Sequence, residues 1–104
     1  MIEVTIDSWK QLERDEEKKV VFVHTPFCAT CQLAERMLAI IEEAKPNQSF
    51  YRLNASFFPE FMEKNKIESV PALLLVEQGI VRDHIYAFES VTNLHEVLEQ
   101  WHQL

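Results

Sequence analysis

The sequence of 104 residues has no long hydrophobic run and no recognisable leader segment. Its longest apolar runs, Val20–Val23 and Ala72–Val76, are far shorter than the roughly 20 residues that a membrane-spanning helix needs. The first residues carry no basic segment followed by an apolar one, so we expect no secretion signal. These absences predict a cytoplasmic protein with no membrane partner.

Positive charge is also scarce. Lys and Arg number 10 against 17 Asp and Glu, which gives a formal net charge of −7. Proteins that bind nucleic acid need clustered Lys and Arg to neutralise phosphates. We therefore do not expect nucleic acid to be a partner.

The chain contains neither a repeat nor a Pro- or Ser-rich linker, and its length fits one domain. We expect a single domain over residues 1–104. Apolar patterning predicts strands at residues 1–6, 20–23, 50–53, 72–76 and 80–88, and helices capped by Asp7, over about 29–44, over 59–64 and capped by Ser90. This alternation predicts an α/β fold with a mixed sheet and helices on both faces.

Cys28 and Cys31 are the two cysteines of the chain, and they lie between a predicted strand and a predicted helix. Unpaired N–H groups and the macrodipole at a helix N-terminus stabilise an anion, so the pKa of the Cys28 thiol should fall below its free value of about 8.5. Cys31 follows about one turn later and can resolve a mixed disulfide on Cys28. A CxxC motif beside a βαβ pattern is typical of cytosolic redox proteins. We expect Cys28 to be the exposed nucleophile, Cys31 the more buried resolving residue, and no bound cofactor.

Several other uses of a cysteine pair were weighed. A zinc site would need two further ligands, and none of His24, His84, His95 and His102 has ligand spacing to the cysteines. Haem attachment fails because Gln32 stands where a histidine is required. An inert core pair, a thiol switch that regulates binding without turnover, and a homodimer sharing a metal between two CxxC motifs all remain open.

Three motifs carry a resemblance to a known family: residues 26–31 (Pro-Phe-Cys-Ala-Thr-Cys), the Val70-Pro71-Ala72 segment and the Gln78-Gly79 pair. On these motifs essentially the whole chain resembles the thioredoxin family, especially its short bacterial members. The resemblance implies a five-stranded sheet in the order 1-3-2-4-5, with Pro71 in the cis form and facing the cysteines. It also implies a monomeric disulfide reductase that acts on disulfide-containing proteins and is recycled by a thioredoxin reductase or a low-molecular-weight thiol.

The same resemblance implies a substrate surface around Cys28. Phe27 and Pro71 would contribute apolar contacts, and Val70 would pair with the substrate backbone by β-type hydrogen bonds. Residues 86–88 would lie near this surface, although Phe88 is expected to belong to the core.

The sequence departs from the family pattern between the two cysteines and on the strand before them. Ala29-Thr30 replaces the usual Gly-Pro pair, and the Thr30 hydroxyl could point at a sulfur, although it is expected to face water. Phe22 stands where the family has a buried Asp that helps to deprotonate the resolving cysteine. His24 is therefore a candidate proton relay, with Ser56 as a candidate hydrogen-bond partner. Arg52 replaces a family lysine, and its head is expected to reach water.

Overall fold

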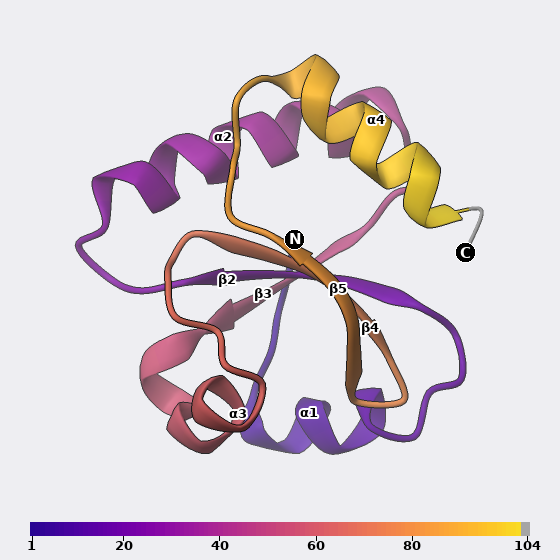
Figure 1. Cartoon of the computed structure of the whole chain (residues 1–104). Coiled ribbons are helices and arrows are strands. Elements are labelled where there is room, and N and C mark those ends of the chain that lie inside the picture. The colour runs from indigo at the N-terminus through magenta and orange to yellow at the C-terminus, as the bar shows by residue number, and fades with distance from the viewer. Residues whose placement is uncertain (103–104) are drawn as a thin grey trace.

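The structure is a computed structural model and describes residues 1–102. A five-stranded sheet in the order β1-β3-β2-β4-β5 forms its centre (Figure 1). Strands β1, β2 and β3 are parallel, whereas β4 runs antiparallel to β2 and to β5. The predicted mixed sheet and its strand order are confirmed. The strands are β1 (Ile2–Glu3), β2 (Lys19–His24), β3 (Phe50–Asn54), β4 (Ala72–Glu77) and β5 (Ile80–Ile85).

Helices cover both faces of the sheet, with α2 and α4 above it and α1 and α3 below it in Figure 1. The predicted order of strands and helices is confirmed, with one addition, a 3-10 turn after β3. None of the helices within residues 1–102 is long and apolar enough to cross a membrane. The helical elements are α1 (Ile6–Leu12), α2 (Ala29–Ala44), η1 (Ala55–Phe57), α3 (Pro59–Lys64) and α4 (Val91–His102).

Strand β2 contributes to the core on both of its faces, as its continuous apolar run predicted. Phe22 belongs to the cluster beneath α2 and α4, which also contains Leu38 and Leu94. Val21 and Val23 belong to the cluster on the opposite face. Successive side chains of a strand point to opposite faces, so one buried strand joins the two layers.

The N-terminal segment differs from the prediction because Thr5 begins the first helix. The Thr5 hydroxyl accepts the N–H of Ser8 at 3.0 Å, and the Ser8 hydroxyl accepts the N–H of Thr5 at 2.8 Å. This reciprocal capping box satisfies two backbone donors. Asp7 consequently lies in the first turn of α1 and is not its cap. The predicted strand over residues 1–6 is therefore shortened to Ile2–Glu3.

The C-terminal hairpin is tight, and the helix after it begins as expected. Gly79 has a φ of +77°, and a Cβ at this position would lie 3.0 Å from Cγ of Glu13. A side chain there would be both strained and crowded. Strand β5 ends at Ile85, three residues before the predicted end. The Ser90 hydroxyl accepts the N–H of Asn93 at 3.0 Å, which confirms Ser90 as the cap of α4.

Candidate active site

The cysteine pair lies at the N-terminus of α2, and Cys28 and Cys31 are joined by a disulfide. Cys28 is the N-cap residue of the helix, and its Sγ accepts the backbone N–H of Cys31 at 3.2 Å. Cys28 is half-buried, whereas Cys31 is only 3% exposed. The order of exposure is the one that the sequence predicted. The helix start thus presents one sulfur to solvent and keeps the other beneath it.

Thr30 lies closer to the reactive sulfur than predicted. Its Oγ1 is 3.4 Å from Cys28 Sγ, so of the two alternatives the hydroxyl takes the one in which it points at a sulfur. Thr30 lies in the first turn of α2, two residues after the cap residue Cys28, and its side chain approaches the cap. The hydroxyl can therefore donate to a Cys28 thiolate as a second hydrogen bond beside the backbone N–H.

Replacing Thr30 by Val should lower the fraction of Cys28 present as thiolate at neutral pH. Val keeps the branched shape of Thr but removes the hydrogen bond to Sγ. The measurement is the rate of iodoacetamide alkylation of the reduced protein between pH 5 and 9. We expect a decrease of roughly three- to tenfold at pH 6.5, equivalent to about 0.7–1.4 kcal/mol, the net contribution of one ordinary hydrogen bond. Thr30→Ser should retain the original rate, and an unchanged rate in Thr30→Val would contradict this role.

Phe27 precedes the cysteine pair in an unusual backbone conformation. Its φ is +61°, in the left-handed region that non-glycine residues rarely adopt. Its side chain is 102% exposed, so the ring extends fully into solvent beside Cys28. Strained backbone and an exposed aromatic ring next to a reactive group are features of a contact site.

A groove lies between the first turns of α2 and the loop before β4. The Val70–Pro71 peptide bond is cis, as the family resemblance implied. Pro71 forms one wall of the groove, which has a volume of about 290 Å³. Val70 is half-buried and packs against both core clusters. The other walls are formed by Thr30, Leu33, Ala34, Met37, Tyr86 and Phe88.

Phe22 is the centre of a row of three rings behind the cysteines. The His24 ring stacks on it at 5.8 Å with an interplanar angle of 14°. Phe88 meets it edge to face at 6.1 Å, which agrees with the core position expected for Phe88. The position of the family's buried Asp is thus filled by an aromatic side chain that is fully buried.

His24 is buried, with 5% of its surface exposed, and its Nε2 atom has no hydrogen-bond partner. Burial lowers the pKa of His24 below its ordinary value of 6.5, and the charge of Arg52 acts in the same direction. Glu3, Glu35 and a hydrogen bond to the Thr25 backbone oppose this shift without outweighing it. His24 is therefore neutral at pH 7.

The hydrogen bond predicted between Ser56 and the His24 ring does not supply a partner for Nε2. The backbone N–H of Ser56 instead donates to Oδ1 of Asn54 at 2.9 Å, where Asn54 caps the 3-10 turn. This local turn was not predicted, and it fixes the position of Ser56.

Arg52 is partly exposed and also pairs with two carboxylates, which the sequence did not predict. Its Nε donates to Glu35 Oε1 at 2.6 Å, and its Nη1 donates to Glu3 Oε1 at 2.8 Å. The parallel register places Glu3 beside Arg52 on neighbouring strands. Glu35 lies four residues, or about one turn, after Cys31 on α2. This spacing puts Glu35 on the same side of the helix as Cys31, and it could have been recognised in the sequence.

A polar hollow of about 440 Å³ brings these groups to the buried cysteine. Its lining includes His24, Cys31, Glu35 and Arg52. Cys31 therefore borders a space that is also lined by one neutral base and a compensated ion pair. Space for water beside a buried thiol provides a route by which a proton can leave.

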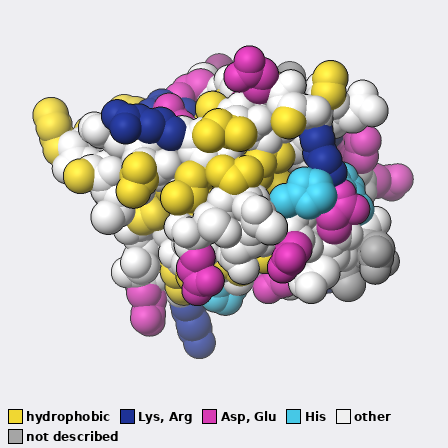
Figure 2. Space-filling model, turned by 90° about the horizontal axis from the view of Figure 1, so that it is seen from above, with side chains coloured by type: hydrophobic (Ala, Val, Ile, Leu, Met, Phe, Trp, Pro, Cys, Tyr) yellow, Lys and Arg dark blue, Asp and Glu magenta, His cyan; other side chains and the backbone are white. Residues whose placement is uncertain are grey.

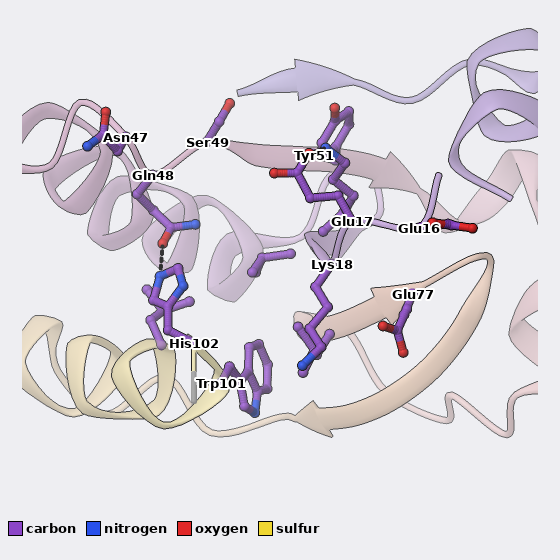
Figure 3. A pocket seen from close by; sticks show the side chains of 14 residues that line it. Glu16, Glu17, Lys18, Asn47, Gln48, Ser49, Tyr51, Glu77, Trp101 and His102 are labelled. Atoms are coloured by element: carbon purple, nitrogen blue, oxygen red, sulfur yellow. Dashed lines mark hydrogen bonds and ion pairs between the residues drawn. The ribbon is translucent and has the colours of Figure 1, made fainter. Parts of the chain in front are cut away.

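A second hollow of about 490 Å³ lies near the other end of β2, away from the cysteines. Figure 3 shows its polar lining, including Gln48 and His102, whose side chains approach to 3.2 Å. Lys19 also lines it and pairs with Asp15 and Glu17. Within residues 1–102, no three His, Cys, Asp or Glu side chains form a group that could hold a metal. This second hollow therefore does not compete with the cysteine pair as a candidate reactive centre.

Two sulfurs that form a disulfide at an accessible helix start are suited to one chemistry, the exchange of that disulfide with another dithiol. The molecule is accordingly a thiol-disulfide oxidoreductase.

Comparison with known sequences identifies its family. The thioredoxin family model matches residues 1–100, and the chain belongs to the thioredoxin family. The thioredoxin-like protein YusE of Bacillus subtilis is 40% identical over 83% of this chain and 81% of its own length. Thioredoxin domain-containing protein 9 of Bos taurus is 29% identical over 78% of this chain, which spans 37% of that longer protein.

Solved structures agree with the fold. The crystal structure of thioredoxin from Trypanosoma brucei brucei matches with a TM-score of 0.80 at 16% identity, over 100% of this chain and 92% of the other. Oxidised mitochondrial thioredoxin 3 from Saccharomyces cerevisiae matches with a TM-score of 0.76 at 17% identity, over 96% of this chain and 94% of that one. At such identities the likeness establishes the fold alone.

Proposed function

We propose that this protein is a protein-disulfide reductase in which Cys28 attacks and Cys31 resolves. The observation that carries the assignment is the difference in exposure between the two sulfurs, together with the N–H and hydroxyl donors that converge on Cys28. Disulfide-containing proteins are the substrates. Phe27, Val70 and Pro71 provide the contact surface around the attacking sulfur.

In the first step the Cys28 thiolate attacks one sulfur of a substrate disulfide. A Cys28–substrate disulfide forms, the substrate S–S bond breaks, and its second sulfur leaves as a thiolate that takes a proton from water. The N–H of Cys31 and the Thr30 hydroxyl stabilise the attacking anion.

In the second step the Cys31 thiol loses its proton and attacks Cys28. The Cys28–substrate bond breaks, the Cys28–Cys31 disulfide forms, and the substrate sulfur that had been attacked first leaves as a thiolate and takes up a proton. Two electrons have then passed from the protein to the substrate. Recycling requires an external dithiol donor, for which we propose a thioredoxin reductase or a low-molecular-weight thiol.

We propose His24 as the proton acceptor for Cys31, acting directly or through water in the hollow that both residues line. Nε2 is buried and unpaired, and the depressed pKa keeps the ring neutral, so a lone pair is available at pH 7. Glu3 and Glu35 are engaged with Arg52, which leaves the imidazole as the uncommitted base.

His24→Gln should slow the resolution of a preformed mixed disulfide by roughly tenfold to a hundredfold, the lower range for loss of a general base. Protonation abolishes the base, so wild-type resolution should hold as pH falls to 6.5 and decline only below it, because the pKa of His24 is depressed. The variant should lose this decline in rate at acidic pH, which is the acidic limb of the pH profile. Rapid-mixing fluorescence or quenched-flow mass analysis measures the step.

The matched control is His84→Gln, because His84 is exposed on β5. Its resolution rate and pH profile should equal those of the wild type. If His24→Gln keeps both the rate and the acidic limb, His24 does not accept the proton.

The proposed setting is a cytoplasmic monomer that takes part in electron transport and cell redox homeostasis. The decisive test is repeated turnover of insulin disulfides in the presence of a reductant. A thiol switch would change its binding with redox state but would not turn over. Continuous reduction of insulin that depends on Cys28 supports the reductase, and a single stoichiometric exchange contradicts it.

A further inference from the structure

Helix α2 carries a second apolar row, of which Met37 packs against the core and the rest is exposed. Its buried residues, among them Cys31 and Leu38, face the sheet. On the solvent side, Leu33 is 54% exposed and Ile40 is 53% exposed. We call this row the α2 stripe; it consists of Ala29, Leu33, Met37, Ile40 and Ala44.

The stripe has the geometry of a helix-docking seam. Its members follow one another at spacings of four, four, three and four residues, which keeps them on one side of a helix. Single exposed apolar residues are ordinary, but a contiguous row indicates a binding surface. Figure 2 looks down on the α2 and α4 layer and shows hydrophobic side chains gathered in a band across it.

The stripe is continuous with the exchange site. Leu33 and Met37 belong to the stripe and also line the groove that contains Thr30 and Pro71. Ile40 lies eleven residues after Ala29, so the part of the stripe between these two residues extends about 16 Å along the helix from the first residue after Cys28. A partner lying on the stripe therefore reaches the reactive sulfur at one end.

The flanks of the stripe favour an apolar rather than a charged partner. Arg36 and Glu43 are exposed at its edge, four residues before and three residues after Ile40, and their charges are opposite. No single sign of charge is selected along the helix. A second copy of the chain seated here would cover the groove beside Cys28, so we assign the surface to the molecule that brings the disulfide.

We propose that the α2 stripe binds an apolar helix face of the substrate protein, adjoining the disulfide that Cys28 attacks. The inference rests on the proposed reductase function and adds a substrate class to it. Preferred substrates carry an apolar segment that extends about 16 Å from the reacting sulfur, the length of helix between Ala29 and Ile40.

The test uses two helical peptides of equal length, each bearing an N-terminal cysteine activated as a 2-pyridyl disulfide. One presents an apolar face over eleven residues, and the other has Gln at those positions. Attack by reduced Cys28 on the peptide sulfur forms the mixed disulfide and releases pyridine-2-thione, whose absorbance gives the rate. The small molecule 2,2′-dithiodipyridine reports the sulfur chemistry without the stripe.

The wild type should react roughly tenfold faster with the apolar peptide than with its Gln counterpart, the effect of burying about one large aliphatic side chain. Ile40→Gln should reduce this preference to about twofold or less and leave the rate with dithiodipyridine unchanged. Ile80→Gln removes an equally exposed residue (51%) from β5 and should preserve the preference.

Four outcomes would overturn the proposal. Equal rates of the wild type with both peptides, or a preference that survives Ile40→Gln, would remove the stripe from substrate binding. A wild-type dimer that Ile40→Gln dissociates in size-exclusion chromatography would make the stripe a contact between copies. If the reduced wild type reacts neither with the peptides nor with dithiodipyridine, the reductase function itself is refuted, and the proposed substrate class with it.

Discussion

Replacing Cys31 by Ser is expected to arrest the protein as a mixed disulfide between Cys28 and its substrate. The attacking sulfur remains at the N-cap of α2, while the sulfur that would release the product is gone. Well-oriented intramolecular groups reach effective concentrations of at least about 10⁵ M, which a millimolar external thiol cannot replace. Insulin turnover should therefore fall at least a thousandfold, measured with reductant in excess.

The trapped species gives this prediction its control. Non-reducing gels and intact-mass measurement should find substrate bound to Cys31→Ser. Cys28→Ser should neither turn over nor trap substrate, because Cys31 is buried at 3% exposure and cannot meet a protein disulfide. Trapping by Cys28→Ser in place of Cys31→Ser would reverse the assigned roles.

Phe22→Ala is expected to produce the largest loss of stability among substitutions near the site. The ring is fully buried and contacts both His24 and Phe88. Removing it leaves a cavity beneath α2, and such substitutions cost about 3–5 kcal/mol. A domain of this size has about 5–15 kcal/mol in total. Urea unfolding of the oxidised protein measures the difference.

The control is Phe57→Ala, since Phe57 is 67% exposed in the 3-10 turn. Its free energy of unfolding should change by about 0.5 kcal/mol or less. A loss below about 1 kcal/mol for Phe22→Ala would mean that neighbouring side chains collapse into the space. The packing of Phe22 against His24 and Phe88 would then contribute little to the stability of the core beneath α2.

Elements with strong local signals could be predicted from the sequence. The helix over residues 29–44 and the short helix over 59–64 have the predicted bounds, because the apolar spacing and Pro59 define them locally. The buried strands β2 and β4 follow from continuous apolar runs. Their order in the sheet, like the cis bond before Pro71, came from the family resemblance and not from local pattern.

What the sequence did not reveal depends on hydrogen-bonding partners, some of them near in sequence and others far away. Asp7 is a good cap in isolation, but the Thr5–Ser8 box satisfies two donors and begins the helix earlier. The surroundings of Arg52 depend on Glu3 and Glu35, which are far from it in sequence. Likewise, no local pattern reveals that Nε2 of His24 lacks a partner, because that depends on what several elements fail to supply.

The left-handed backbone at Phe27 has a consequence for how this sequence could change. Glycine adopts that conformation without the penalty of about 1–2 kcal/mol that a Cβ brings. The exposed ring returns no burial energy to the free protein. Laboratory evolution for heat resistance alone should therefore discard Phe27, whereas selection for disulfide reduction should keep it. The residue found at position 27 after such an experiment therefore indicates whether stability or disulfide reduction was selected.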